Sequence, residues 1–189
     1  MLEVRVKRGD CVLLIIDVQE KLIVTISQKT ELLENIKALV KTSEVLGMPI
    51  LVTEQEKLGE TLPELDRMLP HAPRFRKLAF SCCESSGFMG ELRKLGRKTV
   101  IACGIEAHIC VLQTVLDLLE QGYQVLVPRE ATSSYAAIDR DTAIERMRDA
   151  GAMITTAETA IYELTERAGT EEFRRVLEIV KERREAITP

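Results

Sequence analysis

The fold of this chain can be derived outward from one stretch, Thr99-Val100-Ile101-Ala102-Cys103-Gly104-Ile105-Glu106-Ala107-His108-Ile109-Cys110. Residues 99–103 are apolar throughout and predict a buried strand, and residues 111–121 have the length and apolar spacing of a helix. Gly104 is therefore the corner between them. Cys110 falls in the first helical turn, where unpaired N–H groups and the helix dipole favour the thiolate. The position also suits an inert thiol, because free cysteines are among the most buried residues.

The same alternation of buried strand and helix runs through the rest of the chain. Further strands are expected at 11–16, 49–53, 123–127 and 152–155, with a short extended piece at 76–80. Helices are expected at 31–46, 63–69, 87–95, 136–150 and 157–164, with a charged surface helix at 171–184. Apolar strands that alternate with helices indicate a sheet covered on both faces. The prediction is one α/β domain over residues 1–189, Rossmann-like and three-layered, with a doubly wound, mostly parallel, six-stranded sheet.

Three chemistry-bearing residues are expected to share one rim of this sheet. In doubly wound folds, ligands bind beyond the carboxyl ends of the strands, where the strand order reverses. Asp17 directly follows the strand at 11–16, and Glu54 follows the strand at 49–53, so both should lie near Cys110. A half-buried Asp17 could take the thiol proton, and a nearby Lys77 would favour the charged forms of both groups. Taken singly, each has an ordinary explanation, since such aspartates cap turns and most lysines are solvated.

Composition narrows the class of protein. The 189 residues are 46% hydrophobic and 30% charged, with a formal net charge of -4, which disfavours a nucleic-acid partner. No apolar run approaches the roughly 18 residues of a membrane span, and Arg5-Val6-Lys7-Arg8 leads into a core strand without a cleavage site. We therefore expect a cytoplasmic protein that contacts no membrane. Five cysteines, an odd number in core-like segments, predict reduced thiols.

Several motifs are missing from the sequence. Neither G-x-G-x-x-G nor G-x-x-x-x-G-K-[ST] occurs, so no dinucleotide or nucleoside triphosphate cofactor is expected. There is no C-x-x-C, and the two histidines, His71 and His108, lack metal-ligand spacing, so no metal is expected. The absence of G-x-S-x-G leaves cysteine as the better candidate nucleophile.

Three motifs occur in an order and spacing that mark a family: Leu14-Ile15-Ile16-Asp17-Val18-Gln19, Lys77-Leu78-Ala79-Phe80-Ser81 and Gly104-Ile105-Glu106-Ala107-His108-Ile109-Cys110-Val111. With them, the chain resembles the isochorismatase-like cysteine hydrolases over nearly its whole length. Val52-Thr53-Glu54-Gln55, together with Gly59 and Thr61-x-Pro63-Glu64-Leu65, is most similar to the isochorismatase-domain-containing branch. The substrates of that branch are largely undefined.

The resemblance implies a catalytic triad in one isochorismatase-like hydrolase domain over residues 1–189. Asp17 would be the general base, Lys77 its electrostatic partner and Cys110 the nucleophile. It also implies a cis peptide between Ile105 and Glu106, with the N–H groups of Glu106 and Cys110 forming an oxyanion hole. The expected activity is that of a cofactor-free hydrolase that cleaves a small amide or related carbonyl compound through a Cys110 thioester.

Departures from the family pattern limit what carries over. Nicotinamidases bind metal after the second strand, where this chain has Glu54-Gln55-Glu56-Lys57, so neither zinc nor nicotinamidase activity is inferred. Isochorismate hydrolases have a non-nucleophilic residue at the place of Cys110, which disfavours vinyl-ether hydrolysis. Glu130 and Tyr135 stand where relatives often have an aspartate and an arginine, which leaves the substrate preference open.

Three residues near the expected rim are candidates for substrate binding. Gln19, Glu54 and Gln55 could line the pocket, although a structural hydrogen bond explains Gln19 as well, and exposed loop residues are often polar.

Two other functions stay open at this point. One is a catalytically silent scaffold or ligand-binding protein, because the apolar surface of the helix at 108–121 is broad enough to suggest a homo-oligomer, a dimer or larger. The other is a thiol redox protein that uses Cys82 and Cys83.

Overall fold

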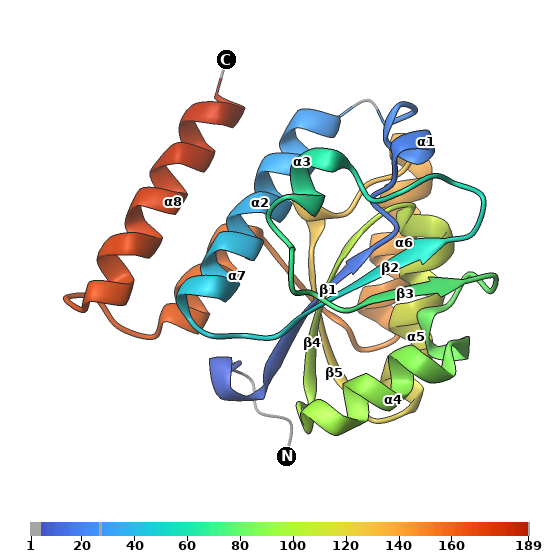
Figure 1. Ribbon diagram of the computed structural model, residues 1–189, viewed down its shortest axis with the longest axis horizontal. Coiled ribbons are helices and arrows are strands. Elements are labelled where there is room, and N and C mark those ends of the chain that lie inside the picture. The colour runs from blue at the N-terminus through green and yellow to red at the C-terminus, as the bar shows by residue number, and fades with distance from the viewer. Residues whose placement is uncertain (1–4, 27, 189) are drawn as a thin grey trace.

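Six parallel strands form one sheet in the computed structural model, which describes residues 5–26 and 28–188. The strands are β1 Cys11–Ile16, β2 Ile50–Gln55, β3 Arg74–Lys77, β4 Thr99–Gly104, β5 Gln124–Pro128 and β6 Met153–Thr155. They are arranged in the order β3-β2-β1-β4-β5-β6, and every neighbouring pair is parallel (Figure 1). The predicted doubly wound, six-stranded sheet is confirmed.

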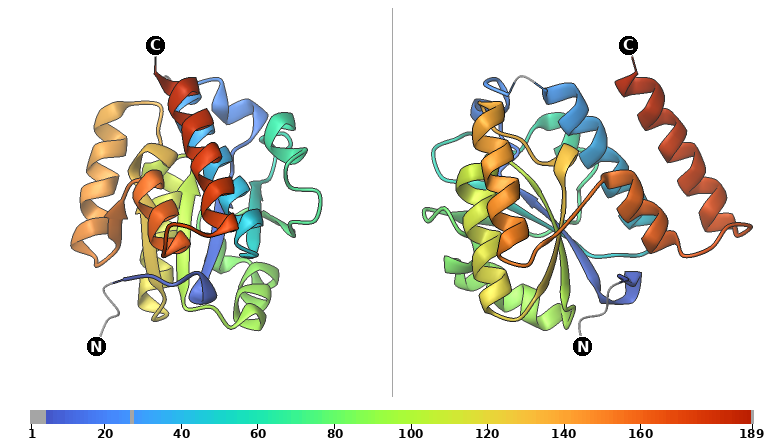
Figure 2. Two further views of the ribbon diagram at one scale, coloured as in Figure 1. Left: turned by 90° about the vertical axis from the view of Figure 1, so that its left-hand side faces the viewer. Right: turned by 180° about the vertical axis from the view of Figure 1, so that it is seen from behind.

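Helices cover both faces of the sheet (Figures 1 and 2). One face carries α2 Lys29–Val45 and α7 Ala157–Thr165, with α8 Glu171–Ile187 packed on these two helices, and the other carries α4 Ser86–Leu95, α5 Leu112–Glu120 and α6 Ala137–Asp149. Short elements complete the described chain: α1 Glu20–Ile23, α3 Pro63–Asp66, the 3-10 turns η1 Arg8–Asp10, η2 Cys82–Glu84 and η4 Arg129–Ala131, and the π-helical turn η3 Ala107–Val111. Within the described residues, no helix has the length and apolar character needed to cross a membrane.

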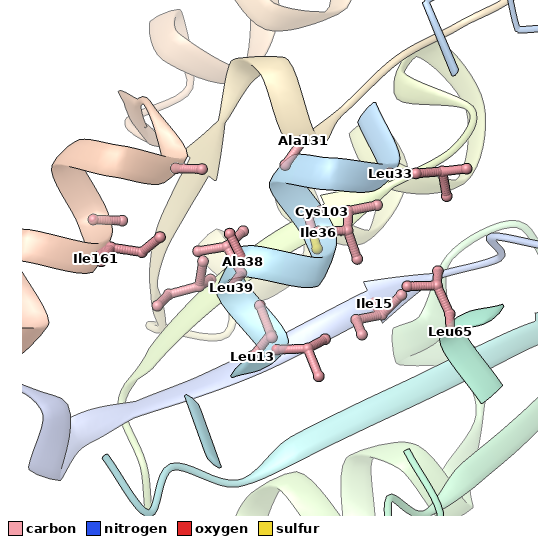
Figure 3. Packing of buried hydrophobic residues seen from close by; sticks show 14 of the residues in the cluster. Leu13, Ile15, Leu33, Ile36, Ala38, Leu39, Leu65, Cys103, Ala131 and Ile161 are labelled. Carbon is pink, nitrogen blue, oxygen red and sulfur yellow. The ribbon is translucent and has the colours of Figure 1, made fainter. Parts of the chain in front are cut away.

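The core is divided by the sheet into two apolar clusters. Leu13 and Ile15 of β1 point toward α2, where they join Ile36 and Leu39 (Figure 3). The alternate residues of β1 point to the opposite cluster, beneath α4, α5 and α6. Every residue of β1 and β4 is buried, as their unbroken apolar runs predict. Each large side chain buried in this way contributes roughly 1.5–3 kcal/mol.

The strand order reverses between β1 and β4, and this places the crevice. From β1 the chain builds outward through β2 and β3, and it then returns to the other side of β1 with β4. Gly104 is in register with Ile16 at the carboxyl ends of these two strands. Its φ is +126°, and a Cβ here would lie 2.0 Å from the Ile16 carbonyl oxygen, so only glycine fits. Crevices at such reversals are where doubly wound folds bind ligands.

Two local expectations were wrong in detail. The lysine segment contains an edge strand, β3, which ends at Lys77 and pairs with β2, whereas the sequence predicted an extended piece at 76–80. The helix after β4 begins as the π-helical turn η3, and regular α-helix starts only at Leu112.

The broad apolar surface of α5 is directed mainly into the core. Leu112, Val115 and Leu118 are buried, and Leu116 and Leu119 pack partly buried against the same cluster. The width of this surface therefore needs no second subunit to explain it, and the homo-oligomer stays a prediction.

Candidate active site

A buried ion pair lies at the carboxyl end of the sheet. Lys77 Nζ is 2.6 Å from Asp17 Oδ2, and both side chains are almost inaccessible to solvent. The ammonium also donates to Gln55 Oε1 at 2.8 Å and to the Phe80 carbonyl at 3.0 Å. Burial lowers the pKa of Lys77, but the Asp17 carboxylate, together with the nearby thiols Cys82 and Cys110, outweighs this effect, so that pKa lies above its ordinary value. Lys77 is therefore a fixed positive charge beside Asp17.

Asp17 is held by β2 as well as by Lys77. It directly follows β1 and has a φ of +51°, and its Oδ1 accepts a hydrogen bond of 2.8 Å from Thr53 Oγ1. Thr53 is the register partner of Ile16, so the parallel pairing of β1 and β2 sets this contact. Sequence reasoning missed Thr53, although its place two residues before Gln55 puts both side chains on one face of the strand.

Cys110 approaches this pair from the turn η3. Its Sγ is 3.9 Å from Gln55 Oε1, which also accepts from Lys77 Nζ, and the Asp17 carboxylate lies near enough to raise the pKa of the thiol. The structure therefore brings together Asp17, Lys77 and Cys110, which lie far apart in the sequence.

The expected preference for the thiolate is wrong in direction. Burial raises the pKa of Cys110 to about 12, and the Asp17 carboxylate adds to the rise, while Lys77 opposes it. The helix dipole does not decide the protonation state, because the thiol is buried near a carboxylate. Cys110 therefore rests as a neutral thiol, with Asp17 nearby as an acceptor for its proton.

The turn before Cys110 is fixed by the neighbouring loop. The peptide between Ile105 and Glu106 is cis, as the resemblance implies. The Ala107 N–H donates to the Ser133 carbonyl at 2.8 Å, and Glu106 Oε2 accepts from the Tyr135 N–H at 2.8 Å. In the described part of the chain, the Glu106 N–H itself donates no hydrogen bond. That free donor suits the expected oxyanion hole, whose assignment to Glu106 and Cys110 stays a prediction.

Of the three residues expected to bind substrate, only Gln55 contacts the triad. Its Oε1 accepts from both Lys77 and Cys110, and its Nε2 donates to the Leu78 carbonyl at 2.7 Å. Gln19 is fully buried and exchanges hydrogen bonds with backbone groups, accepting from the Gln55 N–H at 2.8 Å and donating to the carbonyls of Gln55 and Gly59. Gln19 thus supports the backbone of Gln55, and its contact with a substrate stays a prediction.

Glu54 lies on the other face of β2 from Gln55. Its Oε1 accepts from the Thr61 N–H at 3.0 Å and from Thr61 Oγ1 at 2.7 Å. Burial raises the pKa of Glu54, but these bonds and the nearby Arg76 outweigh it, so that pKa lies below its usual value. The contacts of Glu54 tie the loop after β2, and its role in substrate binding also stays a prediction.

A second thiol lies close to the triad and was not assigned to it from the sequence. Cys82 is fully buried, and its Sγ is 3.6 Å from Thr53 Oγ1. Burial raises the pKa of this thiol to about 11. Cys82 and the neighbouring Cys83 are free thiols.

The other predicted positions take supporting places. Glu130 Oε1 accepts from the Ala157 N–H at 2.7 Å at the start of α7, and Tyr135 has an exposed side chain. In residues 5–26 and 28–188, no group of three or more His, Cys, Asp or Glu side chains is placed to hold a metal ion.

Comparison with known proteins adds independent information. Residues 11–159 match the family model of the isochorismatase domain. The secreted isochorismatase effector Isc1 of Phytophthora sojae is 38% identical over 177 residues, which cover 90% of this chain and 84% of that protein. Human isochorismatase domain-containing protein 2 is 35% identical over 182 residues, 94% of this chain and 86% of that protein.

Solved structures show the same fold. A structure described as the MAR1 ribonuclease from Caenorhabditis elegans superposes with a TM-score of 0.88 at 36% identity, covering 94% of this chain and 92% of that chain. The YcaC gene product of Escherichia coli, described as an octameric hydrolase of unknown specificity, has a TM-score of 0.89 at 23% identity, covering 98% of this chain and 95% of that chain. The second likeness supports the fold alone.

Proposed function

The chain belongs to the isochorismatase family and is a hydrolase of that fold, and from this premise we propose that it is a cofactor-free cysteine hydrolase of small amides or related carbonyl compounds. One observation carries the proposal. The Asp17 carboxylate lies 2.6 Å from the Lys77 ammonium, and Gln55 Oε1 accepts from both that ammonium and the Cys110 thiol. A nucleophile, a base and a group that orients the base are the parts that nucleophilic catalysis requires.

The first half of the reaction forms a thioester. As Cys110 Sγ attacks the carbonyl carbon, its proton passes to Asp17, so the thiol need not ionise beforehand. The N–H groups of Glu106 and Cys110 would bind the oxyanion that develops on the substrate oxygen. Asp17 then gives its proton to the leaving nitrogen while the C–N bond breaks and an amine departs. Lys77 stays charged throughout and favours the ionised form of Asp17 before attack.

The second half of the reaction restores the enzyme. A water attacks the thioester carbon and gives a proton to Asp17. The C–S bond then breaks, the carboxylic acid departs and the proton returns to Cys110 Sγ. Every proton passes through Asp17, which explains why this carboxylate is buried beside both Lys77 and Cys110.

The remaining expectations about the molecule are part of the same proposal. We propose one hydrolase domain over residues 1–189, a small-molecule substrate, a homo-oligomer of two or more copies, and a cytoplasmic location. The E. coli protein of the same fold is described as octameric, and the P. sojae relative is described as secreted.

The test is covalent capture of the nucleophile together with turnover. Wild-type protein, Cys110→Ala and Cys82→Ala are incubated with a panel of small neutral amides and with a thiol-directed aldehyde, and adducts are located by mass spectrometry. We expect the adduct on Cys110, and amide hydrolysis that Cys110→Ala abolishes and Cys82→Ala retains. Modification of Cys82 or Cys83 with Cys110 untouched would overturn the mechanism, and activity in Cys110→Ala equal to wild type would do the same.

RNA belongs in the same panel because a relative is described as a ribonuclease. The net charge of -4 gives the chain no excess positive charge for a polyanion, so we expect no cleavage. RNA cleavage by wild type that Cys110→Ala lacks would replace the amide with a phosphodiester as substrate. If the wild-type protein turns over no member of the panel and forms no adduct, the chain is a catalytically silent protein of this fold.

A further inference from the structure

Exposed apolar side chains concentrate at the carboxyl end of the sheet. Among the described residues, five of the six large hydrophobic side chains that are exposed lie in segments that follow β1, β3 and β5, and the sixth is Tyr162 on α7. The five are Val24, Leu78, Phe80, Tyr135 and Ile138. Scattered exposed apolar residues need no explanation, but a concentration around a reactive centre does.

Three of the five are fixed at the site by their own backbones. The Leu78 carbonyl accepts from Gln55 Nε2, and the Phe80 carbonyl accepts from Lys77 Nζ, so one side of the site is bordered by the chain after β3 (green in Figure 1). On the other side, the Tyr135 N–H donates to Glu106 Oε2. The main chains of Leu78, Phe80 and Tyr135 therefore lie next to the site, while 70%, 52% and 68% of these residues are exposed. We call these three residues the apolar rim.

The positive charge at the site is already paired, and the other charged groups there are carboxylates. Lys77, the cation of the triad, already donates hydrogen bonds to Asp17, to Gln55 and to two backbone carbonyls. Glu106 adds a mostly buried carboxylate next to the turn, with His108 Nδ1 4.0 Å away. A substrate carboxylate would therefore meet Glu106 and Asp17, and among residues 5–26 and 28–188 no unpaired cation is in contact with the triad.

We propose that the apolar rim selects the substrate, which is a neutral amide with an apolar substituent, and that small carboxylates are excluded. This inference rests on the proposed cysteine hydrolase. The reacting carbonyl lies against Cys110, and the apolar substituent lies across Leu78, Phe80 and Tyr135, whose exposed surface it removes from water.

The test uses labelling of Cys110, which does not require turnover. The probes are acrylamide, N-butylacrylamide and sodium acrylate, each of which adds the Cys110 sulfur to its β-carbon and the thiol proton to its α-carbon. Labelling rates are measured by mass spectrometry and divided by the rate of each probe with glutathione. We expect wild type to prefer N-butylacrylamide over acrylamide by about tenfold, because the three methylenes and the methyl of the butyl group are partly buried. Acrylate should be slower than acrylamide by a similar factor.

Variants separate the rim from the rest of the surface. Leu78→Ser and Tyr135→Ser keep the backbone hydrogen bonds and should each lower the butyl preference severalfold. Tyr162→Ser, on α7, removes a matched exposed apolar side chain and should leave the preference unchanged. Light scattering on each variant reports the number of subunits.

The outcomes are distinguishable. A wild-type butyl preference near one, or the same preference in the rim variants as in wild type, overturns the inference while Cys110 labelling still supports the proposed function. Dissociation of an oligomer in Leu78→Ser without a change in preference assigns the rim to a subunit contact and also overturns the inference. If no probe labels Cys110 in wild type, the proposed function itself fails.

Discussion

The role of Asp17 depends on whether the Cys110 thiol is neutral or ionised before the reaction. Asp17 raises the pKa of Cys110, and Lys77 lowers it, so Asp17→Asn removes a contribution that holds the proton on sulfur and leaves the opposing one. We expect the pKa of Cys110 to fall, and alkylation by iodoacetamide at pH 7.5 to become faster by roughly tenfold per unit of fall. Hydrolysis should drop by about 10²–10⁴ because the proton carrier is lost. The measurements are the pH dependence of alkylation and the turnover rate.

A carboxylate far from the site provides the control for this prediction. Asp10 lies in η1, immediately before the amino end of β1, and Asp10→Asn should leave both the alkylation profile of Cys110 and the turnover unchanged. If Asp17→Asn alkylates more slowly than wild type at neutral pH, Asp17 activates the resting thiol, contrary to our prediction.

The hydroxyl of Thr53 gives a second prediction at the scale of the residue. Thr53→Val leaves the buried Asp17 Oδ1 without its 2.8 Å donor, so we expect a loss of about 1–3 kcal/mol in the free energy of unfolding and a lower kcat. Thr42→Val is the matched control, because the buried Thr42 Oγ1 has no hydrogen-bond partner among the described residues. Its replacement should be neutral or stabilising. Urea unfolding of both variants checks this, and equal losses would contradict it.

At the scale of the residue, the sequence predicts which side chains belong to the site better than it predicts their contacts. Three motifs predict Asp17, Lys77 and Cys110, and in the structure Asp17 contacts Lys77 while Gln55 accepts from both Lys77 and Cys110. The hydrogen bond from Thr53 could not be predicted, because it depends on strand register. For Gln19 the sequence leaves both substrate contact and a structural hydrogen bond open, and its backbone partners depend on the path of the loop. The neutral state of the thiol depends on burial, which the residue types alone do not reveal.

Among the elements, the corner after β4 restricts the choice of residue most strongly. Gly104→Ala would place a Cβ 2.0 Å from the Ile16 carbonyl oxygen at a φ that favours glycine, so β1 and β4 must separate locally. We expect a loss of more than about 3 kcal/mol in the free energy of unfolding, together with loss of activity. Gly90→Ala, in α4 with open space around it, should raise that free energy by roughly 0.5–1 kcal/mol.

Calorimetry and urea unfolding compare the two glycine variants. Similar stabilities for Gly104→Ala and wild type would mean that the corner can relax, and that the close approach to Ile16 is not a requirement of the fold.

Elements with strong periodicity were predicted, and those without it were not. The runs in β1 and β4 are apolar at almost every position, whereas β3 is Arg-Phe-Arg-Lys, an edge strand with one buried residue. The turn η3 and the short helix α1 carry no pattern long enough to identify them. The charges of residues 171–184 predict a solvated surface helix, yet Arg183 within it is only 9% exposed.

At the scale of the whole molecule, the position of the site follows from the strand order. The alternation of strands and helices predicts a parallel sheet. The order of its strands depends on the side of the sheet to which each connection returns, and no single segment of the sequence encodes that choice. The reversal between β1 and β4 makes Asp17 and the turn before Cys110 neighbours. The motifs predict which residues belong to the site, and the strand order brings these residues together.

The outermost helix is joined to the rest of the molecule by a buried cation. Arg183 of α8 donates to Asn35 Oδ1 of α2 at 2.6 Å and to Glu158 Oε2 of α7 at 3.0 Å, and so connects three helices. Arg183→Ala leaves the buried Asn35 Oδ1 without its donor and leaves Glu158 bound to Arg184 alone, so we expect a loss of about 1–3 kcal/mol in the free energy of unfolding. The exposed pair between Lys41 and Glu182 also joins α2 to α8, at 2.7 Å, yet Lys41→Ala should cost no more than about 1 kcal/mol, because water already solvates both charges. Urea unfolding of the two variants measures the difference, and if the losses are equal, α8 is held by its apolar contacts through Val176 and Val180 rather than by the buried guanidinium.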